Sequence, residues 1–425
     1  MNHSFYERAE SWIANFRPTA RTGLLLAFAF GFAARLLPEL LSYPHPIGFD
    51  TIYYAWRLKE GVVWAHWSDI FSSWLLYGIL VPIYDVLKIE AFLLLKLAMP
   101  LLFGFNTCGV YYLATKGLSW STRKSLLAVL LFSFQVAALG ISWHFYRNML
   151  GLGILLFTLP WILKDKLDLK SLVMFSVLSV LVVFSHEYGS VLLFVSVLGV
   201  VAARFFRKEG GEVAKVFVAT LPAAGVFLAS VFLRLFPVYR AIQPNILVAF
   251  QGQGHYSGLF FFVTNYLDVV DTFQHYPTYL DLLVSVTSLF AVLYVVILLL
   301  VVVGFFRHKL LDVWMVLLCV GAFGCLVVPF FALDFWNRWM LMLVFPLTYY
   351  ATNGFVKVLH SAKPVVVSLH QFGSLRISKR VAKGLVLMSI VSGFVFMTSP
   401  MFLGKYIAIN IVICCLFFRS LHIEK

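Results

Sequence analysis

The feature that most constrains this chain is its series of long apolar runs. Three of them, 172–185, 283–306 and 311–333, approach or exceed the roughly 20 apolar residues that a helix needs to cross about 30 Å of hydrocarbon. A transmembrane barrel would instead alternate apolar and polar residues over about 10 residues. Charged residues make up 12% of the chain, whereas about a quarter of a soluble domain is charged. We therefore expect an all-α polytopic membrane protein.

We expect about twelve transmembrane helices (11–13) in a single membrane-embedded domain over residues 1–425. The predicted spans are 23–41, 91–115, 125–142, 149–163, 171–186, 189–205, 215–236, 281–306, 310–333, 339–357, 384–400 and 404–420. Before them, residues 1–22 are predicted to form a retained cytoplasmic interfacial segment, because no small-residue cleavage site follows. Two predicted outer loops are long (42–90 and 237–280), and a basic loop, 358–383, is predicted on the cytoplasmic side.

Positive charge sets the expected orientation. With a cytoplasmic N-terminus, the inside segments hold 23 of the 33 Lys and Arg residues, as the positive-inside rule requires. The net charge of +14 is spread over short loops instead of forming a stripe or an arm, which argues against nucleic-acid binding. The five cysteines lie in apolar segments and show neither metal-ligand spacing nor a disulfide framework.

One stretch, 69–90, is apolar enough to span but contains Pro82, Asp85 and Lys88. Counting it as a span would invert every later loop. We therefore expect an amphipathic aromatic helix on or partly in the outer surface, within a long first loop. The alternative is a true span paired with another that the assignment omits.

Ionisable residues gather on the predicted outer face, from Arg35 and Glu39 at the end of the first span onward, and Asp50 is one of them. It follows 43-YPHP-46, which breaks the first helix, and stands in 48-GFDTIYY-54. A carboxylate near the hydrocarbon boundary has a raised pKa, which suits it to accept a proton from a hydroxyl. The alternative is that Asp50 caps a helix over 51–61.

Arg338 lies between Trp336, Asn337 and Trp339 at the start of a predicted span. Its guanidinium fork matches phosphate oxygens and is expected to hold a lipid phosphate. Alternatively, Arg338 pairs with Asp334 or anchors the helix at the interface.

Two further pairs of ionisable residues lie at predicted outer turns. His186 and Glu187 form the first, and His144 and Arg147 the second. Metal binding, substrate hydrogen bonding and a satisfied structural turn all remain open for both pairs, although there is no HExxH spacing.

Together these features resemble the GT-C superfamily of polytopic glycosyltransferases, which use lipid-linked sugar donors on the extracytoplasmic side. The resemblance rests on 34-ARLLPEL-40 at the end of the first span, 48-GFDTIYY-54 in a long first loop, the amphipathic continuation and 334-DFWNRWMLMLVFPL-347. The predicted loop 142-SWHFYRNM-149 lacks the second acid of oligosaccharyltransferase-like members, and no WWDYG-type motif or large soluble C-terminal domain is present. This favours the branch that resembles polyprenyl- or dolichyl-phosphate-mannose-dependent mannosyltransferases.

The resemblance implies an inverting transfer of a sugar from a polyprenyl- or dolichyl-phosphate donor to a glycan, lipid or protein acceptor. Asp50 would be the general base, helped by Glu187 or His186, and Arg338 would hold the donor phosphate with Arg147 or Arg35. Substrate contacts are expected from the following side chains: His186, His144, Tyr53, Tyr54 and Trp336. No cofactor is firmly implied, although a divalent metal is compatible with the chemistry. The site would lie on the extracytoplasmic side, with the cell membrane as the expected location.

Two other classes fit part of the pattern. A transporter or flippase of lipid-linked sugars would also cluster ionisable residues, but such folds often show internal repeats, and none is visible here. A glycan polymerase or ligase would share the donor chemistry, and a non-catalytic membrane scaffold is the remaining alternative.

Overall fold

The computed structural model describes residues 18–43, 47, 51–60, 70–71, 73–235, 263–267, 276–368 and 374–398. In chain order the elements are α2 (Ala20–Leu41), α3 (Thr51–Glu60), α4 (Leu75–Leu87), α5 (Ala91–Tyr112), the π-helical turn η2 (Leu113–Gly117), α6 (Thr122–Ser133), α7 (Val136–His144), α8 (Tyr146–Ile162), α9 (Leu169–Ser185), α10 (Glu187–Phe206), α11 (Gly210–Leu235), β1 (Val263–Thr264), α14 (Tyr279–Gly304), α15 (Lys309–Val327), β2 (Ala332–Leu333), α16 (Trp336–Met342), α17 (Val344–His360), β3 (Val365–Ser368), β4 (Ser374–Ile377) and α18 (Lys379–Thr398). The strands form two antiparallel pairs, β1 with β2 and β3 with β4.

Within the described residues, seven helices are long and apolar enough to cross a membrane. They are Ala20–Leu41, Ala91–Gly117, Glu187–Phe206, Gly210–Val231, Tyr279–Gly304, Lys309–Val327 and Lys379–Thr398. The pair α6 and α7, bent by 62°, meets the same criterion together as one broken span. The chain is therefore an all-α, multi-pass integral membrane protein.

Helices lie in all the predicted spans except 404–420, which is outside the described residues. Two spans expected to be continuous are divided. Residues 125–142 break between α6 and α7, and residues 339–357 are shared by α16 and α17. At the first break, Gln135 donates from Nε2 to the Ser389 hydroxyl of α18, 2.7 Å away. Because α8, α9 and α17 have 17 residues each, membrane crossing by them stays a prediction, as does the count of twelve.

The stretch 69–90 contains the predicted helix, as α4. Leu76 and Leu80 are buried, while Val86 is 80% exposed and Leu87 58% exposed, so an apolar edge faces outward. The helix packs against α3, α8 and α9. A 13-residue helix is too short to cross a bilayer alone, and its placement at the outer surface remains a prediction.

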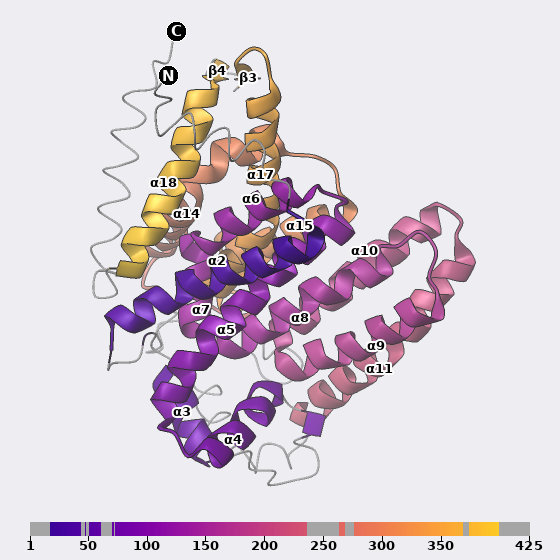
Figure 1. Cartoon of the computed structure of the whole chain (residues 1–425). Helices are drawn as coiled ribbons and strands as arrows, with labels where there is room; N and C mark the ends of the chain where they lie inside the picture. The colour runs from indigo at the N-terminus through magenta and orange to yellow at the C-terminus, as the bar shows by residue number, and fades with distance from the viewer. Residues whose placement is uncertain are drawn as a thin grey trace.

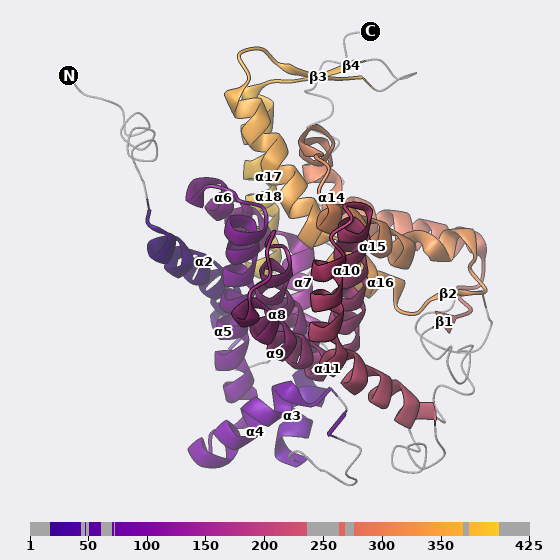
Figure 2. The same ribbon diagram turned by 90° about the vertical axis from the view of Figure 1, so that its right-hand side faces the viewer.

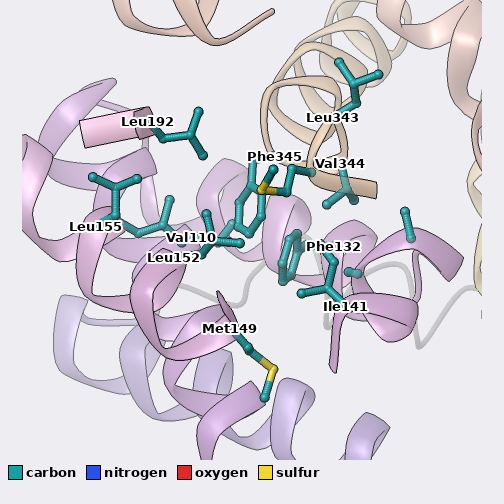
Figure 3. Close-up of a cluster of buried hydrophobic side chains, with 14 of the residues drawn as sticks. Val110, Phe132, Ile141, Met149, Leu152, Leu155, Leu192, Leu343, Val344 and Phe345 are labelled. Atoms are coloured by element: carbon teal, nitrogen blue, oxygen red, sulfur yellow. The ribbon is translucent and has the colours of Figure 1, made fainter. Parts of the chain in front are cut away.

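A continuous apolar core holds the central helices together. Figure 3 shows part of it, where Val110 of α5, Phe132 of α6, Leu152 of α8 and Phe345 of α17 converge. Phe132 and Phe345 contact each other with ring centroids 5.1 Å apart. Elements far apart in the sequence thus meet in one packed interior, which fixes the ends of the helices on which the candidate site is built.

The two ends of the bundle carry different structures. Helices α3 and α4 lie at one end, and the β3–β4 hairpin projects at the opposite end (Figures 1 and 2). The predicted first outer loop and the predicted basic cytoplasmic loop therefore lie at opposite ends of the molecule.

Candidate functional site

Arg338 is surrounded by three aromatic rings from three parts of the chain. Its guanidinium carbon lies 4.0 Å from the ring centroid of Phe335, 4.7 Å from that of Phe145 and 6.0 Å from that of Tyr188. Phe145 joins α7 to α8, Tyr188 is in the first turn of α10, and Phe335 precedes α16. We call these three rings the Arg338 cage. Rings at these distances attract a cation through their quadrupoles.

The segment that carries Arg338 is held in place by the other predicted long loop. Strand β1 pairs with β2, and the buried Tyr266 hydroxyl donates to the Leu333 carbonyl and accepts from the Trp336 N–H. Phe335 has a φ of 56°, a left-handed conformation that costs a non-glycine residue about 1–3 kcal/mol. Such strain persists where surrounding contacts impose it. Here they set the Phe335 ring against Arg338.

His186 and Glu187 lie beside the cage at the turn between α9 and α10. The His186 ring stacks on Tyr188, and its Nδ1 accepts a hydrogen bond of 3.2 Å from the Tyr188 N–H. The Glu187 carboxylate lies 3.7 Å from the same Nδ1. The side chain of Glu187 is 35% exposed, whereas His186 is buried. Of the two, Glu187 is the more exposed side chain.

Asp334 is a buried carboxyl on the same segment. Its Oδ1 accepts a hydrogen bond from the Phe335 N–H at 2.9 Å. Burial raises the pKa of Asp334 to about 7, and this N–H and the charge of Arg338 oppose the rise. A carboxyl with this pKa titrates near neutral pH. The electrostatic field at Arg338 therefore changes with its protonation state.

Arg35 belongs to a second cluster, in which Glu39 lies between two cations. Arg35 Nη1 is 2.6 Å from one carboxylate oxygen, and Lys96 Nζ is 2.9 Å from the other. The side chains of Arg35, Glu39 and Lys96 are 0%, 4% and 7% exposed, so the trio is a buried site with a net charge of +1. Arg35 also donates from Nε to the Ser142 carbonyl at the end of α7. Its Nη2 has no hydrogen-bond partner among the described residues.

The first turn of α3 is fastened to α8. The Thr51 hydroxyl bonds the Tyr146 hydroxyl over 2.6 Å, and the Tyr146 hydroxyl also donates to the Ile47 carbonyl. Tyr54 stacks on Tyr146 with ring centroids 4.6 Å apart. Asp50 lies outside the described residues, as does the side chain of Tyr53. Thr51, the residue directly after Asp50, bonds Tyr146, and Tyr146 directly follows Phe145 of the cage. Thr51 is thus held next to the cage.

The remaining predicted residues surround these two clusters. His144 ends α7 with its ring centroid 6.0 Å from that of Phe145, and Arg147 is half-buried in the first turn of α8. Trp336 is 6% exposed and belongs to the packed segment behind Arg338. The structure therefore brings His186, Glu187 and Arg338 together, with His144 and Arg147 on the adjoining turn, while Arg35 lies in the buried trio.

Two contributors were missed by the sequence analysis. Lys96 lies inside the predicted span 91–115, and the presence of an ionisable residue within a span is the signal that could have identified it. Phe145 gave no signal, because its role depends on contacts from other helices. Across the described ranges, no group of three or more His, Cys, Asp or Glu side chains is arranged to hold a metal ion.

In comparisons with known proteins, no family model matches the chain and no curated protein matches it significantly.

Proposed function

We propose that this protein is a membrane glycosyltransferase that moves a sugar from a polyprenyl-phosphate donor to a glycan, lipid or protein acceptor. The observation that carries the proposal is the Arg338 cage. Arg338 forms a side-chain hydrogen bond with Tyr188, and the planar guanidinium, with five N–H donors, offers its remaining donors as a fork that matches a phosphate. Phe145, Tyr188, Phe335 and Arg338 are all partly buried, and the lower dielectric of a partly buried site strengthens the attraction for an anion.

The reaction is a single displacement. Asp50 takes the proton of an acceptor hydroxyl, and the oxygen attacks the anomeric carbon of the donor. The bond from that carbon to the phosphate oxygen breaks, and the bonding electrons leave with the polyprenyl phosphate. Arg338 stabilises the developing charge, and the anomeric configuration inverts. Glu187, the more exposed residue of its pair, is the second carboxylate available to the acceptor.

The proposal gives Arg35 a different role from Arg338. Full burial and the ion pair with Glu39 commit Arg35 to the trio. Its bond to the Ser142 carbonyl holds the turn that leads to Phe145. Arg35 therefore positions the cage, and Arg338 contacts the donor.

Transfer from radiolabelled polyprenyl-phosphate mannose and glucose, measured with the full chain in proteoliposomes, tests the proposal. Asp50→Asn should abolish transfer while donor binding is retained. Arg338→Lys should weaken donor binding by about tenfold, because an ammonium cannot form the fork. Arg307→Lys is the matched control, since Arg307 is an exposed arginine between α14 and α15.

Three results would contradict the proposal. Full transfer by Asp50→Asn would show that Asp50 is not the general base. Unchanged donor affinity in Arg338→Lys would show that Arg338 is an interfacial anchor. Donor movement across the bilayer with no product would instead identify a transporter of lipid-linked sugars.

A further inference from the structure

An open hollow lies at the end of α17 opposite the Arg338 cage. Its volume is about 430 Å³, and its lining includes Ser361, Lys363, Pro364, Ser378, Lys379 and Arg380. Helix α17 has 17 residues, so at 1.5 Å per residue roughly 25 Å separates its two ends. The hollow is therefore separate from the candidate active site.

The lining of the hollow favours an anion. Lys363, Lys379 and Arg380 are exposed cations, and no carboxylate lies in the part of the lining that the structure describes. The Ser378 hydroxyl accepts a hydrogen bond from the Val381 N–H and caps α18. Helix α18 thus directs its positive N-terminal dipole toward the hollow, in addition to the three side-chain charges.

The hairpin beside the hollow presents apolar and basic side chains together. In the β3–β4 register Val366 pairs with Arg376, and both are exposed, Val366 to 56%. Figures 1 and 2 show the hairpin projecting at the end of the bundle where α18 begins. Since α18 is one of the helices able to span the bilayer, its first residue lies near the headgroup region.

We propose that this hollow binds the phosphate of an anionic phospholipid on the membrane surface opposite the candidate active site. Lys363, Lys379 and Arg380 surround the phosphate, and Val366 contacts the acyl chains or glycerol region. The position of the hollow relative to the bilayer favours a lipid over a soluble phosphate compound, because the hollow lies at the end of a membrane-spanning helix and beside the exposed Val366. The site is independent of the proposed transferase activity.

Binding of fluorescent phosphatidylglycerol to the full chain in phosphatidylcholine nanodiscs tests this site. A basic residue in contact with an anionic headgroup contributes about 1 kcal/mol, or about fivefold in affinity, so three such contacts together contribute about a hundredfold. The triple variant K363Q/K379Q/R380Q should therefore bind phosphatidylglycerol at least about tenfold more weakly than the unaltered protein. The matched control is K166Q/K170Q/R307Q, which removes the same charges from exposed positions in other loops predicted on the same face. The affinity of this control variant should stay within about twofold of that of the unaltered protein, because none of its three residues lines the hollow.

Two further measurements make the result specific. K363R/K379R keeps the charges and should retain binding, and equal melting temperatures of the variants exclude loss of the fold. The proposal is overturned if the hollow and control variants weaken binding equally, because general surface charge would then explain it. It is also overturned if soluble glycerol phosphate displaces the lipid at equal concentration, because the ligand would then be a soluble phosphate.

Discussion

Substitution of Glu39 by Gln should destabilise the protein by about 3–5 kcal/mol. Glu39 is 4% exposed and forms ion pairs of 2.6 Å with Arg35 and 2.9 Å with Lys96. Breaking a buried ion pair by removing one partner leaves an uncompensated charge, which costs about this much. Arg35 stays protonated, so the variant keeps a buried cation whose negative partner is gone. Because Lys96 comes from α5 and Arg35 from α2, the loss should loosen the contact between these two helices.

Glu209 provides a matched control, because it also lies between two cations. It is 3.8 Å from Arg204 and 3.2 Å from Arg207, but its side chain is 32% exposed. Glu209→Gln should therefore cost less than about 1 kcal/mol. The free energy of unfolding can be measured by SDS titration in mixed micelles. The double variant Glu39→Gln/Lys96→Met also removes the buried ammonium of Lys96, so it should recover part of the free energy of unfolding lost in Glu39→Gln. Equal effects of Glu39→Gln and Glu209→Gln would refute this reasoning about burial.

Two further predictions concern packing and pH. Gly354→Ala should lower the free energy of unfolding by about 1–3 kcal/mol, because the added Cβ would overlap the Leu300 carbonyl oxygen. Gly225→Ala is the control: no atom lies within 4 Å of its added Cβ, so the same SDS titration should show no loss of stability. Burial raises the pKa of Asp334 to about 7, so the native carboxyl retains a proton that the unfolded chain releases near pH 4. Stability should fall by up to about 4 kcal/mol between pH 4 and pH 7 and stay level above that, and Asp334→Asn should remove the slope in unfolding measured against pH.

The positions of the helices were predictable because the apolar runs reflect the solvent that surrounds them. Breaks within the helices were not. The span predicted over 125–142 bends by 62° between α6 and α7, where Gln135 bonds Ser389 from a helix 254 residues away. A single glutamine in an apolar run gives no indication of that partner. The local pattern therefore sets where helices form, whereas the contact made at this break depends on the tertiary structure.

The candidate site was predictable to the extent that charge in an apolar chain is costly. This argument identified Arg338, His186 and Glu187, which lie together in the structure. It identified Arg35 as well, but could not distinguish an arginine neutralised by Glu39 from one available to a ligand. Burial and partner distances make that distinction, and neither can be read from spacing along the chain.

The turn between α7 and α8 connects the two clusters, which explains how distant segments contribute to one site. Phe145 contacts Arg338, and the next residue, Tyr146, bonds Thr51 in the first turn of α3. Three residues before Phe145, the Ser142 carbonyl accepts the bond from Arg35. A change in this turn would therefore act both on the cation proposed to hold the donor and on the segment directly after Asp50. Of the four segments that carry the resemblance to GT-C enzymes, three lie within residues 34–90 and the fourth, 334–347, lies far along the chain. The turn contacts 34–40, 48–54 and 334–347.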